Sequence, residues 1–149
     1  DLGRIELDHV TDIVGDVSAQ SLDNATDAIL SGDVGAFDGA FAGWIKGGNA
    51  PFQLLAAVMR QFQQLDLLRN AVDNGASASA AVAASRPPVF FSRRSIVENA
   101  VRRWNAQAVA RALDRLQATV LASRTRANLD TPTTRQALLA ITIEASRLR

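Results

Sequence analysis

The chain has 149 residues, of which 48% are apolar and 5% aromatic, and its formal net charge is +1. This length fits one domain, and the lack of cysteine excludes disulfide bonds and thiol chemistry. Because the sequence has no stretch of about 18 apolar residues and no signal-peptide pattern, we expect a cytoplasmic protein without a membrane partner.

Alanine and leucine supply most of the apolar residues, which is typical of helical proteins. Residues 5–14 repeat apolar side chains at helical spacing and predict a short helix that the Gly-Asp pair at 15–16 ends. The next helix is predicted to begin at Ser21, as its N-cap, and to stop at Gly32.

Two longer helices are predicted next. Asp33 is an acceptable N-cap for a helix that ends at Gly47 and Gly48. Pro51 begins and Gly75 ends a helix of roughly 35 Å, which we expect to be the spine of the domain. The apolar stripes of these two helices are Val34, Phe37, Phe41, Trp44 and Ile45, then Leu54, Val58, Phe62, Leu65 and Val72.

The second half of the chain predicts four more helices around a corner, "RPPVFF". Residues 76–85 are expected to form a short alanine-rich helix that the prolines end. Ser92 is predicted to cap the next helix, and Asn105 the helix over 106–127. A capped, proline-started helix over 130–148 closes the sequence. The expected inward residues are Ile96, Val97, Ala100, Val101, Trp104, Val109, Leu113, Leu116, Val120, Leu138, Leu139, Ile141, Thr142, Ala145 and Leu148.

Together these elements predict an all-α bundle of seven or eight helices, with no repeat of fixed period. Trp44 and Trp104 lie at helical spacing with core residues, so we expect both to be buried. Catalysis requires converging groups of tuned pKa, and the chain has no tyrosine and a single histidine. His9 shares a helix face with Asp12 and Asp16, which we interpret as a solvated acidic face. We expect no enzymatic activity, metal ion or cofactor.

Charge is divided unevenly along the chain. Residues 1–85 carry 4 basic and 11 acidic side chains, whereas residues 86–149 carry 12 and 4. A basic half would suit nucleic acid or an acidic partner, although filling solvated helix faces would give the same pattern.

Four arginines lie at the two ends of the helix predicted after the corner. Arg93 and Arg94 are in its first turn, where the helix dipole disfavours cations by about 0.3–1 kcal/mol each. With the free backbone N–H groups there, they would bind a phosphate or a carboxylate; alternatively, both are exposed and screened. Arg102 and Arg103 lie at the other end, where the dipole favours them.

Phe90 and Phe91 follow two prolines, which stiffen the approach to them. We expect at least one of these phenylalanines to pack into the core. The other would be free to stack on an unpaired base, since every base has a π-face.

Three stretches carry a resemblance to a known family. They are "LDHVTDIVGDVSAQSLDNATDAILSGD", "NAPFQLLAAVMRQFQQLDLLR" and "PPVFFSRRSIVENAVRRWNAQAVARALDRL". In this order and spacing, over nearly the whole chain, they resemble the delta subunit of the bacterial DNA polymerase III clamp loader. No single stretch is diagnostic, so the resemblance rests on their order.

The resemblance implies that residues 1–16 are the C-terminal remnant of an AAA+-like lid domain and that residues 17–149 are the helical collar domain. Collar domains assemble the loader subunits into a ring, so the implied partners are those of the delta-prime and gamma/tau subunits. The sliding clamp would be reached through an N-terminal domain outside this chain. The family's delta subunit has no working ATP site, and the sequence has no GxxxxGK[ST] motif.

The resemblance also implies a weak contact with primer–template DNA. Phe90 and Arg124 match positions where the family has an aromatic and a basic residue near the template strand, and we add Arg93 and Arg94 as nucleic-acid contacts. At Ala127 the chain departs from the family, which can carry a second aromatic residue there.

One alternative is a stand-alone DNA-binding regulator, and another is a helical adaptor unrelated to replication. A regulator would need a helix-turn-helix whose second helix exposes base-reading side chains. The helix over 106–127 offers mostly alanine, which argues against the regulator.

Overall fold

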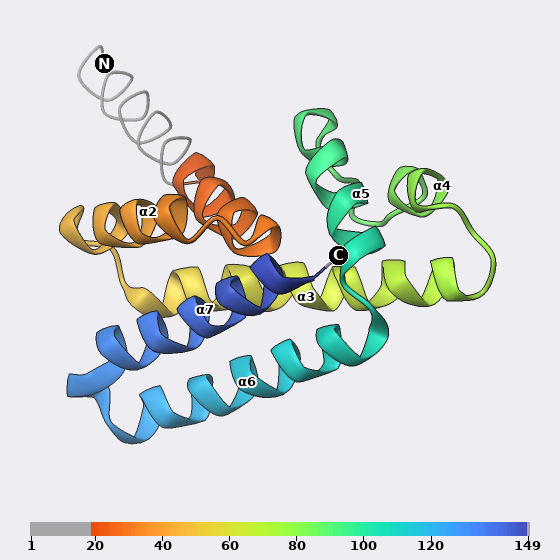
Figure 1. Cartoon of the computed structure of the whole chain (residues 1–149). Coiled ribbons are helices and arrows are strands. Elements are labelled where there is room, and N and C mark those ends of the chain that lie inside the picture. Colours follow the sequence, from red (N-terminus) through yellow and green to blue (C-terminus); the bar gives the residue numbers. More distant parts are fainter. Residues whose placement is uncertain (1–18, 149) are drawn as a thin grey trace, which may run out of the picture.

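A computed structural model describes residues 19–148 of the chain (Figure 1). In this part, seven α-helices and two 3-10 turns form a bundle without a strand, which confirms the predicted all-α fold. A first helix over residues 19–31 is followed by α2 (Val34–Lys46), α3 (Pro51–Asp73), α4 (Ala78–Ala83), η1 (Phe91–Arg93), α5 (Arg94–Arg103), α6 (Ala106–Thr125), η2 (Ala127–Leu129) and α7 (Asp130–Arg147). The helix predicted over 5–14, the acidic group around His9 and the proposed lid remnant lie outside the described residues.

The long helix α3 is the centre of the bundle. It contacts α4, α5, α6 and α7, all of which come later in the chain. The last two long helices, α6 and α7, form an antiparallel pair joined through η2. Helices α4 and α5 lie near the C-terminal part of α3 (Figure 1). Helix α2 packs on α7. The prediction that α3 is the spine of the domain is therefore confirmed.

The predicted apolar stripes face the core. On α3, α5, α6 and α7 the buried members include Leu54, Val58, Phe62, Leu65, Val97, Val101, Val109, Leu116, Leu138 and Ile141. Members at the ends of stripes, such as Val34 and Val72, are partly buried. The 3.6-residue period therefore identified the inward faces correctly.

Helix starts were predicted correctly where one polar side chain directly precedes a helix. Asp33 and Asn105 each accept a hydrogen bond from the backbone N–H three residues on, at 3.0 and 2.8 Å. Pro51 is the first residue of α3, and the alanine-rich helix α4 is capped by Ser77. These caps satisfy N–H groups that have no partner within the helix.

Three predicted caps were wrong. Ser21 lies inside the first helix. Ser92 belongs to η1, and α5 begins at Arg94 without a side-chain cap. Helix α7 also lacks a side-chain cap, because η2 leads into it through Leu129. At both of these starts a 3-10 turn precedes the helix and takes the place of a capping side chain.

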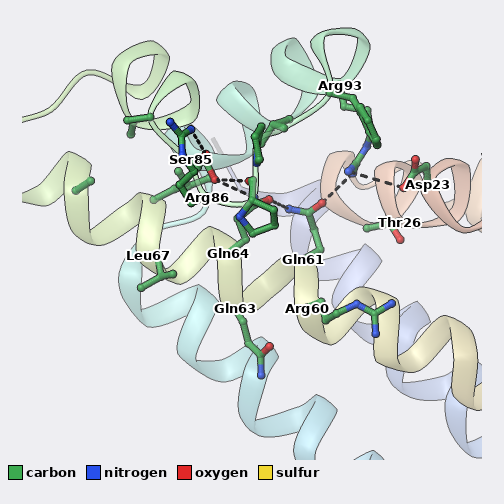
Figure 2. A pocket seen from close by; sticks show the side chains of 18 of the residues that line it. Asp23, Thr26, Arg60, Gln61, Gln63, Gln64, Leu67, Ser85, Arg86 and Arg93 are labelled. Atoms are coloured by element: carbon green, nitrogen blue, oxygen red, sulfur yellow. Dashed lines mark hydrogen bonds and ion pairs between the residues drawn. The ribbon is translucent and has the colours of Figure 1, made fainter. Parts of the chain in front are cut away.

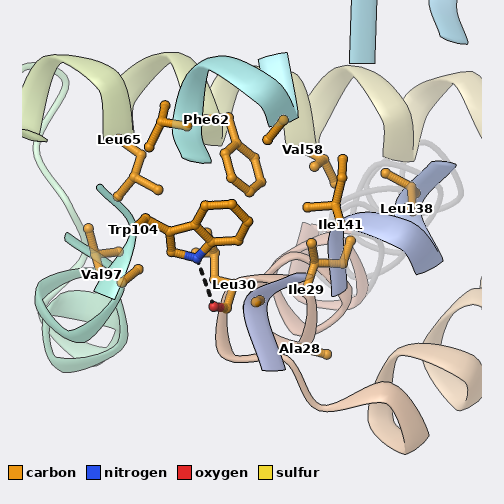
Figure 3. Close-up of a cluster of buried hydrophobic side chains, with 14 of the residues drawn as sticks. Ala28, Ile29, Leu30, Val58, Phe62, Leu65, Val97, Trp104, Leu138 and Ile141 are labelled. Atoms are coloured by element: carbon orange, nitrogen blue, oxygen red, sulfur yellow. Dashed lines mark hydrogen bonds between the residues drawn. The ribbon is translucent and has the colours of Figure 1, made fainter. Parts of the chain in front are cut away.

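Trp104 is the largest fully buried side chain and lies where α5 ends (Figure 3). Its ring meets Phe62 edge-on, with the ring centroids 4.9 Å apart, and its Nε1 donates to the carbonyl of Leu30 at 3.1 Å. This bond satisfies a buried indole N–H and a carbonyl at the end of the first helix. Trp44 is also buried and donates to the carbonyl of Ala50 at 2.8 Å, so the expected burial of both tryptophans is confirmed.

Arg103 joins the C-terminal ends of two other helices. Its Nη2 donates to the carbonyls of Ala145 at 2.6 Å and Leu148 at 3.3 Å, and its Nη1 donates to that of Ser31 at 3.3 Å. The sequence had suggested a favourable interaction with the dipole of its own helix. In the fold, this guanidinium instead satisfies carbonyls of α7 and of the first helix, which lie beside α5.

Gly32 sets the turn between the first helix and α2. Its φ is +78°, in the left-handed region that favours glycine. A Cβ at this position would meet the backbone of α7, lying 2.8 Å from the carbonyl carbon of Ala145 and still closer to Ser146. The absence of a side chain therefore lets the turn pack directly on α7.

Replacing Gly32 with alanine should lower the free energy of unfolding by about 2 kcal/mol or more, because the left-handed conformation costs about 1–2 kcal/mol and the backbone contact adds to it. Urea unfolding followed by circular dichroism measures this. The matched control is Gly39→Ala within α2, where a Cβ meets nothing within 4 Å. That control should be neutral or stabilising by up to about 1 kcal/mol. Equal stability of the two variants would contradict the packing of this turn.

Candidate functional site

The corner between α4 and α5 is fastened to α3 by side-chain hydrogen bonds. Gln64 on α3 donates through Nε2 to the hydroxyl of Ser85 at 2.9 Å and to the carbonyl of Pro87 at 3.4 Å (Figure 2). The Ser85 hydroxyl itself donates to the carbonyl of Pro87 at 3.3 Å. Val89 then turns inward and is 7% exposed. The corner is therefore held in place by both polar and apolar contacts.

Phe90 and Phe91 both project from this corner into solvent. Their exposed fractions are 75% and 85%, so the prediction that at least one packs into the core is wrong. The inward position at the corner is taken by Val89. Because the backbone of the corner is already held in place, binding through these exposed aromatic side chains would cost little additional backbone ordering. The corner is therefore a candidate contact surface.

Arg93 points back into the protein. Its guanidinium forms an ion pair with Asp27 of the first helix, with Nη2 and Oδ1 2.5 Å apart, and Nη2 also donates to Oε1 of Gln61 at 2.8 Å. The carboxylate of Asp23 lies 3.8 Å from Nη1. The Arg93 and Asp27 side chains are 16% and 18% exposed, so both charges are largely shielded from water. Arg93, the last residue of η1, thus links the turn directly before α5 to the first helix and to α3.

These contacts belong to a longer chain of polar side chains. Gln61 donates through Nε2 to Oε1 of Gln64 at 3.0 Å, which connects the Asp27–Arg93 pair to Ser85 in the corner (Figure 2). This network was not predicted from the sequence. Its one visible signal was the pair of glutamines three residues apart beside the apolar stripe of α3, where a buried amide requires a partner.

Arg94 points elsewhere and contacts one of the exposed phenylalanines. Its Cζ lies 5.8 Å from the centroid of the Phe91 ring, within the range of a cation–π interaction. Its Nε is buried and has no hydrogen-bond partner within residues 19–148. The arrangement in which Arg93 and Arg94 together hold a phosphate is therefore not formed, because one guanidinium is engaged by Asp27 and the other stacks on Phe91.

Arg124 is exposed in the last turn of α6. That turn lies at the end of the bundle opposite to the corner (Figure 1). A helix of 20 residues such as α6 is about 30 Å long, and α6 begins shortly after α5. The four predicted nucleic-acid contacts therefore do not form one patch: Phe90 and Arg94 lie at the corner, Arg93 is turned inward, and Arg124 is remote.

A groove of about 1090 Å³ runs along α3 beside the corner. Its walls come from the first helix, α3, α4 and the corner, and they include Leu22, Leu67, Ala80, Pro88 and Phe90. A smaller groove of about 480 Å³ shares three lining residues with it and continues along α3. Neither groove was predicted from the sequence, because the apolar periodicity predicts one packing face for each helix.

Two kinds of feature are not found within residues 19–148. No three histidine, cysteine, aspartate or glutamate side chains are gathered where they could hold a metal ion. No helix in this part of the chain combines the length and the apolar character that crossing a membrane requires.

Comparison of the chain with models of known protein families, with curated proteins and with solved structures finds no match. The resemblance to the clamp-loader delta subunit therefore stays a prediction from the sequence. The geometry described above adds an anchored aromatic corner and an open groove as candidate contact surfaces.

Breaking the shielded pair should destabilise the fold. Asp27→Ala and Arg93→Ala should each lower the free energy of unfolding by about 2–3 kcal/mol, near the lower end of the range for buried pairs because both side chains keep some contact with water. The double variant should lose less than the sum of the two, since the second removal leaves no unpaired charge. The difference between the loss in the double variant and the sum of the two single losses is the coupling energy of the pair. Urea unfolding of the unchanged chain, the two single variants and the double variant measures it.

The exposed pair of Arg135 and Asp38 provides the matched control. Its closest N···O distance is 2.6 Å, but its side chains are 45% and 51% exposed. The same set of variants there should give a coupling energy of about 0–1 kcal/mol. A coupling between Arg93 and Asp27 no larger than this control would contradict a structural role for Arg93.

Proposed function

We propose that the chain is the collar domain of a bacterial clamp-loader delta subunit and that it assembles the loader ring. The observation that carries the proposal is the order of the three quoted stretches, which spans nearly the whole sequence. An all-helical bundle within residues 19–148 is compatible with it. In this role the chain holds neighbouring subunits and performs no chemistry of its own.

The exposed apolar side chains are compatible with an assembly role. Leu121 in α6 is 65% exposed and Leu129 in η2 is 39% exposed, so the tip where α6 meets α7 presents apolar surface. Phe52 and Leu67 on α3 are 47% and 66% exposed. Apolar side chains that cluster on a surface suit contacts with other proteins better than contacts with solvent.

Co-expression with the collar domains of the delta-prime and gamma/tau subunits from the same cells tests the assembly role. The chain should co-elute with them in size-exclusion chromatography as a complex, because the collar domains are the proposed ring contacts. An unrelated helical domain of similar size serves as the control. Failure to co-elute, under conditions where the full-length delta subunit assembles with them, would contradict the proposal.

We propose in addition that the aromatic corner makes a weak contact with single-stranded template DNA. Phe90 is 75% exposed and directly precedes Phe91, which carries the Arg94 guanidinium over its ring, so an exposed aromatic side chain and a positive charge lie on the same short segment. Stacking of a base on an aromatic side chain contributes about 1–3 kcal/mol. Arg124 would add a separate contact to a phosphate at the other end of the bundle, and Arg93 would act by holding the corner.

The Phe90→Ala variant should weaken binding of a fluorescent oligothymidine by at least about fivefold, as measured by anisotropy at low salt. The control Phe52→Ala removes another exposed phenylalanine, remote from the corner in sequence, and should leave binding unchanged. Affinity should fall steeply as salt increases. Equal binding by the two variants would contradict the corner contact, whereas tight and sequence-selective binding of duplex DNA would favour the stand-alone regulator.

A further inference from the structure

The outer side of α3 carries a second stripe of side chains, opposite the one that faces the core. At spacings of three and four, it consists of Phe52, Ala56, Arg60, Gln63, Leu67 and Ala71. All six line one or both of the grooves along α3. A spine helix with apolar residues on two faces has two packing surfaces. Residues 19–148 cover the inner surface, whereas on the outer one Phe52, Arg60, Gln63 and Leu67 are exposed and Ala56 and Ala71 are partly buried.

The two grooves form a single track. Ala19, Leu22 and Arg60 line both, so the smaller groove continues the larger one along α3. The first helix borders the track where the two grooves meet, and Trp44 and Phe52 line one end of the track. At the other end, the larger groove is bordered by α4 and the corner (Figure 2). From Phe52 to Ala71 the track is about 28 Å long, which is the length of an α-helix of about five turns.

The charges of the side chains that line the track determine which kind of partner would bind there. Arg60 and Arg86 line it and are exposed, and no carboxylate within residues 19–148 lies within ion-pair distance of either. The acidic side chain in its lining is Asp23, which faces the guanidinium of Arg93. An occupant with carboxylates would therefore meet two uncompensated positive charges, whereas a basic occupant would be repelled.

We propose that this track binds an amphipathic helix of a partner protein, with an apolar stripe flanked by acidic side chains. The stripe packs between Phe52 and Leu67, as apolar anchors do in helix-in-groove recognition. The flanking carboxylates pair with Arg60 and Arg86. The Asp27–Arg93 network fixes the wall formed by the corner, so the track is formed before the partner arrives. This proposal stands whether or not the chain belongs to a clamp loader.

Three synthetic peptides of 20 residues test it by titration into the isotope-labelled chain, followed by nuclear magnetic resonance. One is an amphipathic helix with leucine on one face and glutamate on both flanks, the second has lysine in place of glutamate, and the third is a scramble of the first. The glutamate peptide should shift amide signals around Ala56, Arg60 and Leu67 and should bind at least about tenfold more tightly than the lysine peptide.

Charge reversal provides the decisive variant. In the double variant Arg60→Glu and Arg86→Glu, the lysine peptide should bind more tightly than the glutamate peptide. The control Arg115→Glu with Arg126→Glu makes the same change in net charge on two exposed residues, one in α6 and one directly after it, and should keep the original preference. Thermal melts establish that both double variants remain folded.

Four results would overturn the proposal. The first two are that the glutamate peptide binds no more tightly than the lysine peptide, or no more tightly than its own scramble. The other two are that the shifted amide signals lie outside the track instead of within it, or that the glutamate peptide shows no saturable binding. Sedimentation equilibrium of the chain alone identifies self-association. A dimer that Leu67→Glu dissociates and that the glutamate peptide does not displace would assign the track to a second copy of the chain instead.

Discussion

The ion pair between Arg93 and Asp27 joins parts of the chain that are 66 residues apart and that no local pattern connects. Through Gln61, it also joins the first helix and η1, the turn directly before α5, to α3. Two largely shielded charges are stable there because each has its partner, and the guanidinium has the Gln61 amide oxygen as well. The position of the corner, and with it the wall of the track along α3, depends on this cluster.

The same cluster lies between two faces of α3, one buried in the core and one exposed. On its inner face, Phe62 meets Trp104 and the core is closed (Figure 3). On its outer face, Leu67 and Arg60 line an open track. The network of Gln61, Gln64 and Ser85 runs between these faces and holds the corner against α3 (Figure 2). A rigid, closed interior beside a preformed open surface is the arrangement that scaffold proteins need for binding other helices.

Local chemistry was readable from the sequence, and contacts between distant segments were not. The caps at Asp33 and Asn105 were predictable because a capping side chain acts within three residues of itself. The starts of α5 and α7 were not, because 3-10 turns precede both. Whether Arg93 and Phe90 point into the protein or into solvent depends on how the corner lies on α3, and tertiary packing determines that. Two features of α3 did not fit a helix with a single apolar face: Gln61 next to the apolar stripe, and Leu67 outside it.

We propose that this chain works as a helical scaffold whose outer α3 surface receives another helix. A structure of this chain within the assembly purified from its own cells tests this most directly. We predict helical domains of neighbouring subunits packed against the bundle and a helix lying along α3 between Phe52 and Ala71. An α3 surface open to solvent, together with a nucleotide held by side chains of this bundle, would contradict it.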